Sequence, residues 1–290
     1  MMRCLIFLAA LIAPAANAAP LTYEVIRTSD KSFAANIVLL KGEKKAILID
    51  APYTRADAHR VVAAILDSGK ELEAIYVTHD HPDHYYLAEV IRQAFPNARY
   101  VSHPAVVKAI WHSLPYKQAR WTKLLGENGP QFPTAPAPLE GDTLTLEGHE
   151  IKILGPMQGD HSVNTALWLP SMKALFPSDM VHNQVVLWFV ESDAAQISAY
   201  RKSLDTLIAL KPEIVVPGHE RLGLSHDASA LAFTKAYLDA WPLMAKKAKN
   251  AAEMVQLVKK AFPDTIDPNG DFSLTTSARV TMGEEPKWDE

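Results

Sequence analysis

The chain of 290 residues is 48% hydrophobic and 21% charged, so it can bury a sizeable core and fold as a globular protein. Its 33 acidic residues outnumber its 29 basic residues and no basic run occurs, which argues against nucleic acid as a partner. The single cysteine, Cys4, excludes a disulfide scaffold.

Residues 1–18 have the pattern of a secretory signal peptide. The segment MMRCLIFLAALIAPAANA carries Arg3 near its start, then an apolar run, then an Ala-Asn-Ala cleavage motif. The apolar run is too short to remain as a membrane span, and a buried N-terminal helix fits the proline and alanine-rich exit less well. We therefore expect a mature chain of residues 19–290, without cysteine and without a membrane span, in the periplasm or secreted.

The first half of the mature chain alternates strands and helices. Two β-rich runs, residues 33–42 and 44–53, are joined by a Lys-Gly-Glu-Lys turn and predict a hairpin. Apolar residues at helical spacing, followed by Gly69, predict a helix over residues 54–69. Further expected elements are a strand at 72–78, a helix at 86–95, a strand at 98–103, a helix at 104–114 and a proline-rich loop at 130–138.

The second half also alternates strands and helices, but its sequence does not repeat that of the first half. The expected elements are a hairpin at 142–154, two strands within 164–178, a helix at 194–210, a strand at 213–220 and a helix at 227–241. Pro242 is expected to break the helical packing that follows, and the tail from Pro263 carries no recognisable chemistry. Two mixed sheets packed face to face with helices outside satisfy this order, although the pattern alone does not fix the fold.

Residues 76–90, YVTHDHPDHYYLAEV, hold three histidines and two aspartates within six positions. On a strand-to-helix loop, His79 and His81 can point at one ion, while the turn brings Asp83 and His84 toward a neighbouring position. Imidazole nitrogen and carboxylate oxygen are ligands that zinc accepts where thiolates are missing. A solvated polar loop is the alternative, but it does not explain so dense a cluster at the mouth of an apolar strand.

The chain offers partners for this cluster at three later strand ends. His161 stands just before an expected strand, and Asp179 and His219 stand just after two others. Ligands at strand ends are positioned by a rigid sheet, as metal chemistry requires. Each residue alone is a weak signal, but their shared placement indicates a metal site assembled from distant segments.

The set H-x-H-x-D-H, followed by a later His, Asp and His, resembles the metallo-β-lactamase-fold hydrolase superfamily over about residues 23–241. The resemblance implies an α/β fold, the αββα four-layer sandwich, with a dinuclear site at one edge and a C-terminal helical extension within a single domain, residues 19–290. It assigns one ion to His79, His81 and His161, and the other to Asp83, His84 and His219, with Asp179 bridging and Asp50 supporting the site from behind.

Several departures from the family pattern weaken a β-lactamase function. Tyr85 and Tyr86 replace a usual glycine pair, and Asp160 replaces the usual glycine before the third histidine. Asp179 stands where β-lactamases commonly carry Cys or Ser, and His182 stands where one group carries a Lys for the drug's carboxylate. These changes leave the fold expectation intact.

We therefore expect a hydrolase with two Zn²⁺ per chain, in which metal-bound hydroxide attacks an ester, lactone, thioester or amide carbonyl. Asp83 is expected to bind one ion and orient the hydroxide. The alternatives are a periplasmic metallo-β-lactamase and a zinc-binding module without turnover. The roles of Tyr85, Tyr86, His182 and Trp188, the native metal and the oligomeric state are not predicted by the sequence.

Overall fold

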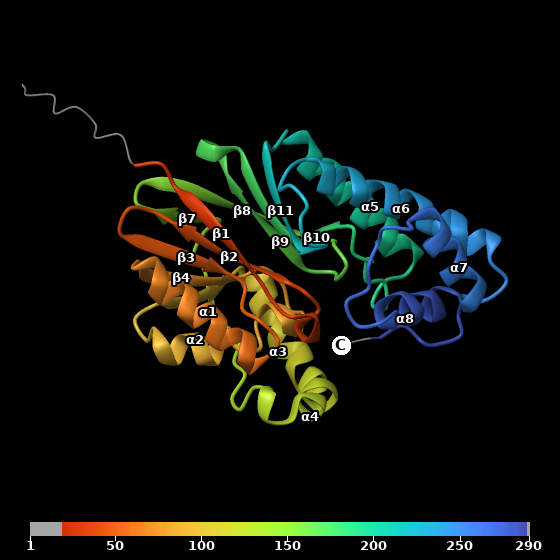
Figure 1. Ribbon diagram of the computed structural model, residues 1–290, viewed down its shortest axis with the longest axis horizontal. Helices are drawn as coiled ribbons and strands as arrows, with labels where there is room; N and C mark the ends of the chain where they lie inside the picture. The colour runs from red at the N-terminus through yellow and green to blue at the C-terminus, as the bar shows by residue number, and fades with distance from the viewer. Residues whose placement is uncertain (1–18, 289–290) are drawn as a thin grey trace, which may run out of the picture.

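The computed structural model describes residues 19–288, so the expected signal peptide lies outside the described residues. Two β-sheets pack face to face, and helices cover the outer face of each sheet (Figure 1). This is the αββα sandwich that the sequence predicted. Each sheet with its helices comes from one half of the chain.

The first sheet has strand order β1-β2-β3-β4-β5-β6. Strands β1 to β3 are antiparallel neighbours, whereas β3, β4, β5 and β6 run parallel. The strands are β1 (Thr22–Arg27), β2 (Asn36–Lys41), β3 (Lys45–Ile49), β4 (Glu71–Val77), β5 (Arg99–Ser102) and β6 (Ala137–Pro138). The predicted hairpin at residues 33–53 is β2 and β3.

Three helices cover this sheet, α1 (Arg55–Ser68), α2 (Ala88–Ala94) and α3 (Pro104–Lys117). The side chain of Thr54 caps α1 by accepting from the backbone N–H of Asp57, and Gly69 ends it in the left-handed region with φ 65°. After α3 the chain continues through a π-helical turn (Gln118–Thr122) and α4 (Lys123–Leu125).

The second sheet has strand order β11-β10-β9-β8-β7. Its strands are β7 (Thr143–Leu146), β8 (His149–Met157), β9 (Asn164–Leu169), β10 (Ala174–Asn183) and β11 (Ile214–Glu220). All pairs are antiparallel except β10 with β11, which are parallel. The carboxyl ends of β10 and β11 therefore lie side by side.

The outer face of the second sheet carries α5 (Ala194–Ala209) and α6 (Ser229–Lys247), and the chain ends with α7 (Ala251–Ala261) and α8 (Phe272–Thr281). The expected break at Pro242 is wrong, because α6 continues through this residue to Lys247. Pro242 is exposed, while Leu238 and Trp241 of the same helix are buried. Packing of this buried face outweighs the one backbone hydrogen bond that proline removes.

Apolar side chains form a layer between the two sheets and a further layer beneath each set of helices. Tyr76 of β4 and Phe176 of β10 both lie in the central layer, and the Tyr76 hydroxyl is 3.0 Å from Thr165 Oγ1 across it. Among residues 19–288, no helix is both long and apolar enough to cross a membrane.

Candidate metal centre

The loop after β4 carries the histidine-rich cluster into the interior. β4 ends at Val77, and residues His79 to His84 are all buried. Pro82 begins a single 3₁₀ turn, Pro82–His84, which reverses the chain and turns Asp83 and His84 toward the second sheet. The backbone amide of Thr165 donates to the Thr78 carbonyl at 3.0 Å, so the loop is fixed to β9.

The remaining candidate ligands come from the second sheet. Asp160 and His161 precede β9, Asp179 lies within β10, and His219 lies in β11. All four are buried. Because β10 and β11 are parallel neighbours, Asp179 and His219 come together, and His219 Nε2 is 3.2 Å from Asp179 Oδ2.

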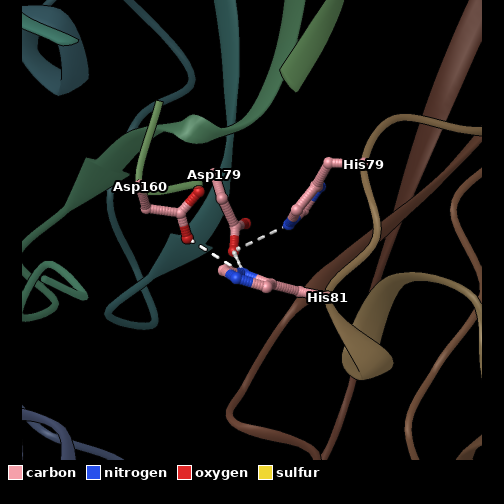
Figure 2. A group of neighbouring side chains, drawn as sticks. All are labelled: His79, His81, Asp160 and Asp179. Carbon is pink, nitrogen blue, oxygen red and sulfur yellow. Dashed lines mark ion pairs between the residues drawn. The ribbon is translucent and has the colours of Figure 1, made fainter. Parts of the chain in front are cut away.

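The first group of potential metal ligands is His79, His81, Asp160 and Asp179, shown in Figure 2. Asp179 Oδ2 lies 3.5 Å from His79 Nε2 and 3.9 Å from His81 Nδ1. Asp160 Oδ2 lies 3.1 Å from the same His81 nitrogen. One ligand atom from each residue lies within 4.8 Å of all the others, which is the spacing that a shared ion requires.

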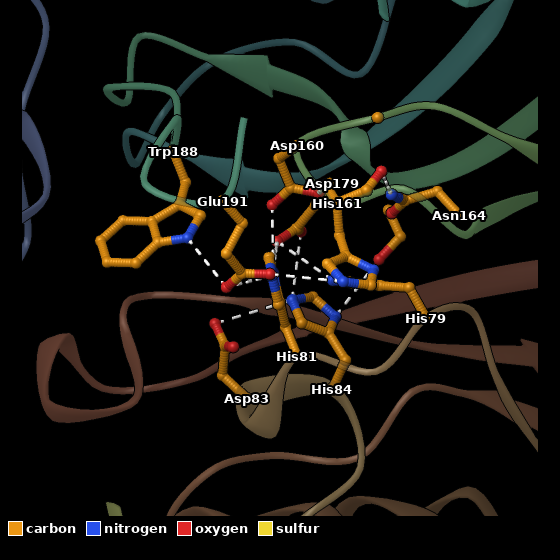
Figure 3. A network of polar contacts seen from close by, with 12 residues as sticks. His79, His81, Asp83, His84, Asp160, His161, Asn164, Asp179, Trp188 and Glu191 are labelled. Carbon is orange, nitrogen blue, oxygen red and sulfur yellow. Dashed lines mark hydrogen bonds and ion pairs between the residues drawn. The ribbon is translucent and has the colours of Figure 1, made fainter. Parts of the chain in front are cut away.

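The second group is Asp83, His84, Asp179 and His219. His84 Nε2 lies 3.1 Å from Asp179 Oδ1, and Asp83 Oδ2 lies 3.6 Å from His84 Nε2 and 3.5 Å from His219 Nε2. Asp179 belongs to both groups (Figure 3). Its Oδ2 faces His79, His81 and His219, and its Oδ1 faces His84. The two groups therefore adjoin through one carboxylate, as a dinuclear centre needs.

Several ligand atoms of the two groups make no hydrogen bond with one another and are placed to bind metal ions instead. His79 Nε2, His84 Nε2, Asp160 Oδ2 and Asp179 Oδ1 are buried and make no hydrogen bond among the described residues. Buried polar atoms are normally paired, and such a concentration at one place indicates a missing partner that binds both nitrogen and oxygen. A divalent cation satisfies this requirement.

His161 lies beside the first group rather than within it. Its Nδ1 is 2.8 Å from Asp80 Oδ1, and its Nε2 is 3.4 Å from Glu191 Oε2. Glu191 also lies 3.3 Å from His81 Nε2, on the side of that ring away from Asp160. The role of His161 as a ligand, which the resemblance implied, stays a prediction, whereas the geometry brings Asp160 into the group.

Sequence reasoning did not find Asp160 or Glu191 as site residues. Asp160 was noted only as a departure from glycine, although its place directly before His161 was an available signal. Glu191 lies in an irregular segment after β10 without any motif. Its carboxylate, at the centre of Figure 3, faces His81, His161 and the indole of Trp188.

Electrostatic attraction between the buried histidines and carboxylates shifts their pKa values and so determines their charge. Burial alone lowers the pKa of His81, but the carboxylates of Asp160 and Glu191 outweigh this effect and raise it well above its usual value. Burial raises the pKa of Asp179, but His219 and His84 hold it well below its usual value. For Glu191, burial is likewise outweighed, chiefly by His81, and its pKa falls to about 2. The carboxylates of Asp179 and Glu191 are therefore ionised and able to bind cations.

Asp50 supports the second group from behind. It follows β3 with φ 68°, a left-handed conformation that is uncommon outside glycine. Asp50 Oδ2 lies 2.8 Å from His84 Nδ1 and accepts from the hydroxyls of Thr78 at 2.9 Å and Ser178 at 2.8 Å. The ring of His84 is thereby oriented with Nε2 toward Asp179.

A buried ion pair lies next to His161, beside the first group. Asp80 and Lys117 are both fully buried, and Lys117 Nζ donates to the Asp80 carbonyl at 2.7 Å and to its Oδ2 at 3.1 Å. Burial raises the pKa of Asp80, but Lys117 and His161 hold it well below its usual value. Asp80 therefore stays charged and orients the His161 ring.

A pocket opens over both groups. It is lined by Phe33, Tyr53, His81, Pro82, Asp83, Lys117, Trp121, Asp160, Asp179, His182, Val185, Val186, Trp188, Glu191, His219, Pro268 and Ser273. Trp188 is thus a pocket residue, whereas Tyr85 and Tyr86 are buried in the core beneath the first sheet's helices. Burial, and then the nearby His219, lowers the pKa of His182 to about 4, so this ring is neutral at pH 7.

The family model of the metallo-β-lactamase superfamily matches residues 31–219, and the chain belongs to this superfamily. The matched region contains every candidate metal ligand and ends at His219. A comparison with curated protein sequences gives no significant match.

Solved structures share the fold at low sequence identity. A metallo-β-lactamase family protein from Thermus thermophilus superposes with a TM-score of 0.62 at 21% identity, covering 89% of this chain and 92% of that one. A metallo-β-lactamase from Pontibacter korlensis superposes with a TM-score of 0.53 at 19% identity, covering 71% of this chain and 87% of that one. The metallo-β-lactamase FIM-1 from Pseudomonas aeruginosa, in its mono-zinc form, superposes with a TM-score of 0.55 at 12% identity, covering 76% of this chain and 90% of that one.

Proposed function

We propose that the protein is a metal-dependent hydrolase that cleaves an ester, thioester, lactone or amide at a carbonyl carbon, with two zinc ions per chain. The observation that carries the proposal is the pair of buried ligand groups that share Asp179 at the floor of an open pocket. Histidine and carboxylate donors without any thiolate match the ligands of catalytic zinc sites.

Bound divalent ions supply two kinds of chemistry here, a water acidified to a pKa of about 7 and a Lewis acid for the substrate's carbonyl oxygen. The chain contributes the geometry. Asp179 holds the two groups together, and the supporting contacts of Asp50 and Asp80 fix the histidine rings.

Asp83 is the candidate catalytic residue. It lines the pocket and belongs to the second group, with its Oδ2 3.5 Å from His219 Nε2. A carboxylate in this position can accept a hydrogen bond from the attacking water and hold it toward the carbonyl. Asp83→Asn is expected to weaken metal binding at the second group and, when assayed at saturating zinc, to lose about 100-fold in kcat.

A panel assay of the zinc-loaded protein tests the proposal. Activated esters, thioesters, lactones and cephalosporins are offered, and hydrolysis of at least one non-lactam class is expected, with loss on chelation and recovery on addition of zinc. Absence of turnover for every substrate, with two ions bound, would support a zinc-binding module instead.

β-Lactam cleavage is expected to be weak or absent. Asp179 occupies coordination positions at both groups, and His182 is neutral because its pKa is about 4, so it offers no fixed cation for a β-lactam carboxylate. Efficient opening of cephalosporins with no activity on esters, lactones or thioesters would reverse this conclusion and favour the periplasmic metallo-β-lactamase.

We also propose that the protein is exported and that the mature chain starts at or near Ala19. The support is the sequence of residues 1–18, with its charged start, apolar run and Ala-Asn-Ala motif. Mass spectrometry of the protein from periplasmic and cytoplasmic fractions tests this, and an intact N-terminus confined to the cytoplasm would contradict it.

A further inference from the structure

The C-terminal segment, which lies beyond the region matched by the family model, builds one side of the pocket. Pro268 and Ser273 line the pocket directly. The segment is joined to the loop after β10 by backbone hydrogen bonds from Ile266 to Gln184, from Val186 to Ile266 and from Trp288 to Val190, and by one from Phe189 to the Ser277 hydroxyl. The tail that looked uninformative in sequence is therefore part of the site.

Six aromatic side chains, here called the aromatic wall, meet at this side of the pocket. Trp188 lies 6.0 Å from Phe272 and 5.5 Å from Trp288, measured between ring centroids. Trp121 contacts the same two rings at 6.4 and 6.2 Å. The wall is completed by Phe33 and Tyr53, which both contact Trp121.

Four members of the wall line the pocket, although Tyr53 also belongs to the core beneath the first sheet's helices and Phe33 and Trp121 pack against it. Phe33, Tyr53, Trp121 and Trp188 line the pocket, and Phe33, Trp121 and Trp188 are only partly buried. Phe33 takes a left-handed backbone conformation with φ 57°, and its carbonyl oxygen lies 2.9 Å from His219 Nδ1. This ties one member of the wall directly to a candidate metal ligand.

The charges of the residues that line the pocket disfavour an anionic ligand. The Arg120 guanidinium lies 3.7 Å from the centroid of the Trp288 ring, but neither of these two residues lines the pocket. Among the described lining residues there is one lysine and no arginine, and Lys117 is paired with Asp80. Four carboxylates face the metal groups, those of Asp83, Asp160, Asp179 and Glu191. Their combined charge balances that of two divalent ions, so little positive charge remains to attract a carboxylate or phosphate.

We propose that the aromatic wall binds an uncharged aromatic or bulky apolar group of the substrate next to the scissile carbonyl, so that the enzyme acts on neutral aryl or apolar esters and thioesters. This specificity rests on the proposed function. Apolar lining with few polar groups is typical of a small-molecule site, and aromatic faces prefer aromatic ligands. The C-terminal segment contributes by holding Trp188 and Trp121 in place through Phe272 and Trp288.

Binding of a ligand that cannot be hydrolysed tests the wall without requiring turnover. Isothermal titration of the zinc-loaded full chain with acetophenone, a neutral aryl ketone, is expected to show one site, and Trp188→Ala and Trp121→Ala are each expected to weaken binding about tenfold. Trp111→Ala is the matched control, because Trp111 is 61% exposed on α3, and it should leave binding unchanged. 4-Acetylbenzoate, which adds a carboxylate to the same ring, should bind more weakly than acetophenone.

Equal acetophenone binding by wild type and both wall variants, or tighter binding of 4-acetylbenzoate, would overturn the inference. Circular dichroism of each variant separates loss of the wall from loss of fold, and Trp121→Phe should retain most of the affinity.

Kinetics then distinguish the two proposals. With p-nitrophenyl butyrate and the anionic p-nitrophenyl hemisuccinate, kcat/KM should favour the neutral ester, and the preference should shrink in Trp188→Ala. Wall-dependent ketone binding without hydrolysis of any ester, thioester, lactone or amide would overturn the proposed function and leave the binding site standing. Hydrolysis of both esters at equal rates in all variants would support the proposed function and overturn the role of the aromatic wall in specificity.

Discussion

Gly218 of β11 lies directly against Asp179 of β10. A Cβ atom at position 218 would be 2.0 Å from Asp179 Oδ1 and 2.6 Å from the backbone carbon of Ser178. Side chains do not tolerate such distances, and here backbone as well as carboxylate would have to move. The absence of a side chain at 218 is therefore what lets the shared carboxylate sit between the two ligand groups.

Gly218→Ala is expected to displace Asp179 and to lower the metal content at both groups, with a loss of about 1–3 kcal/mol in the free energy of unfolding. Elemental analysis and chemical denaturation measure the two effects. Gly141→Ala is the control, because position 141 has φ 75° and open space around it, so that variant should lose stability but retain metal. Full metal content in Gly218→Ala would contradict the role of this close contact.

The purified zinc-loaded protein is expected to hold close to two ions per chain. His219→Ala should empty the second group selectively, since His219 belongs only to that group, and His79→Ala should impair the first. Inductively coupled plasma mass spectrometry after gel filtration gives the stoichiometry. One ion or fewer under zinc-replete conditions would count against a dinuclear centre.

Asp160→Asn is expected to weaken metal binding at the first group by about tenfold, because Asp160 contributes a charged oxygen beside His81. Competition with a chromogenic chelator measures this affinity. Asp67→Asn, an exposed change at the end of α1, makes the same alteration of net charge and should have no effect. An unchanged affinity in Asp160→Asn, with strong loss in His161→Ala, would return the first group to the three-histidine set that the resemblance implied.

Lys117→Met is expected to destabilise the fold by about 3–5 kcal/mol, because it leaves the Asp80 carboxylate buried without its cation. Denaturant unfolding measures the loss. Adding Asp80→Asn to that variant removes the unpaired charge, so the double variant should recover part of the stability. If the two single losses simply added in the double variant, no coupling between Lys117 and Asp80 would exist.

Asp57 gives the protein a pH-dependent contribution to stability that is independent of metal. Burial raises its pKa, but hydrogen bonds from Ser32, Thr54 and Ser29 outweigh burial and lower it below its usual value. Because the folded-state pKa is depressed, the contribution is complete above the unfolded pKa of about 3.9 and is lost as the pH falls through the folded value.

Asp57→Asn should therefore cost about 1–3 kcal/mol at pH 7, and the difference from wild type should shrink below about pH 4. Both proteins are compared free of metal, so that loss of ions in acid does not contribute. A difference that stays constant down to about pH 2 would show that the carboxylate charge is not what matters.

The sequence predicted most of the fold and of the metal centre because their signals are local. His79, His81, Asp83 and His84 stand within one short loop, and His219 lies at the end of a recognisable strand. The expectation that Asp179 stands just after a strand is wrong, because β10 continues past it to Asn183. The only local signal for Asp160 is its place directly before His161. Glu191 could not be assigned, because its relation to His81 exists only after the second sheet has docked. The same holds for Lys117, whose partner is 37 positions away, and for Trp288, which reaches the pocket only through tertiary packing.

Each ligand group draws residues from both sheets, with His79 to His84 following β4 of one and Asp160 to His219 belonging to the other. Ions bound at these groups would act as cross-links between the two halves of the chain, in addition to apolar packing and polar contacts such as that of Asn36 with the Pro217 carbonyl. Binding to the folded state alone stabilises it by mass action, in proportion to the logarithm of the free ion concentration over the dissociation constant. On the proposed function, the melting temperature of this protein is therefore expected to rise with the concentration of free zinc, because ions bound at this edge would tie the two sheets together.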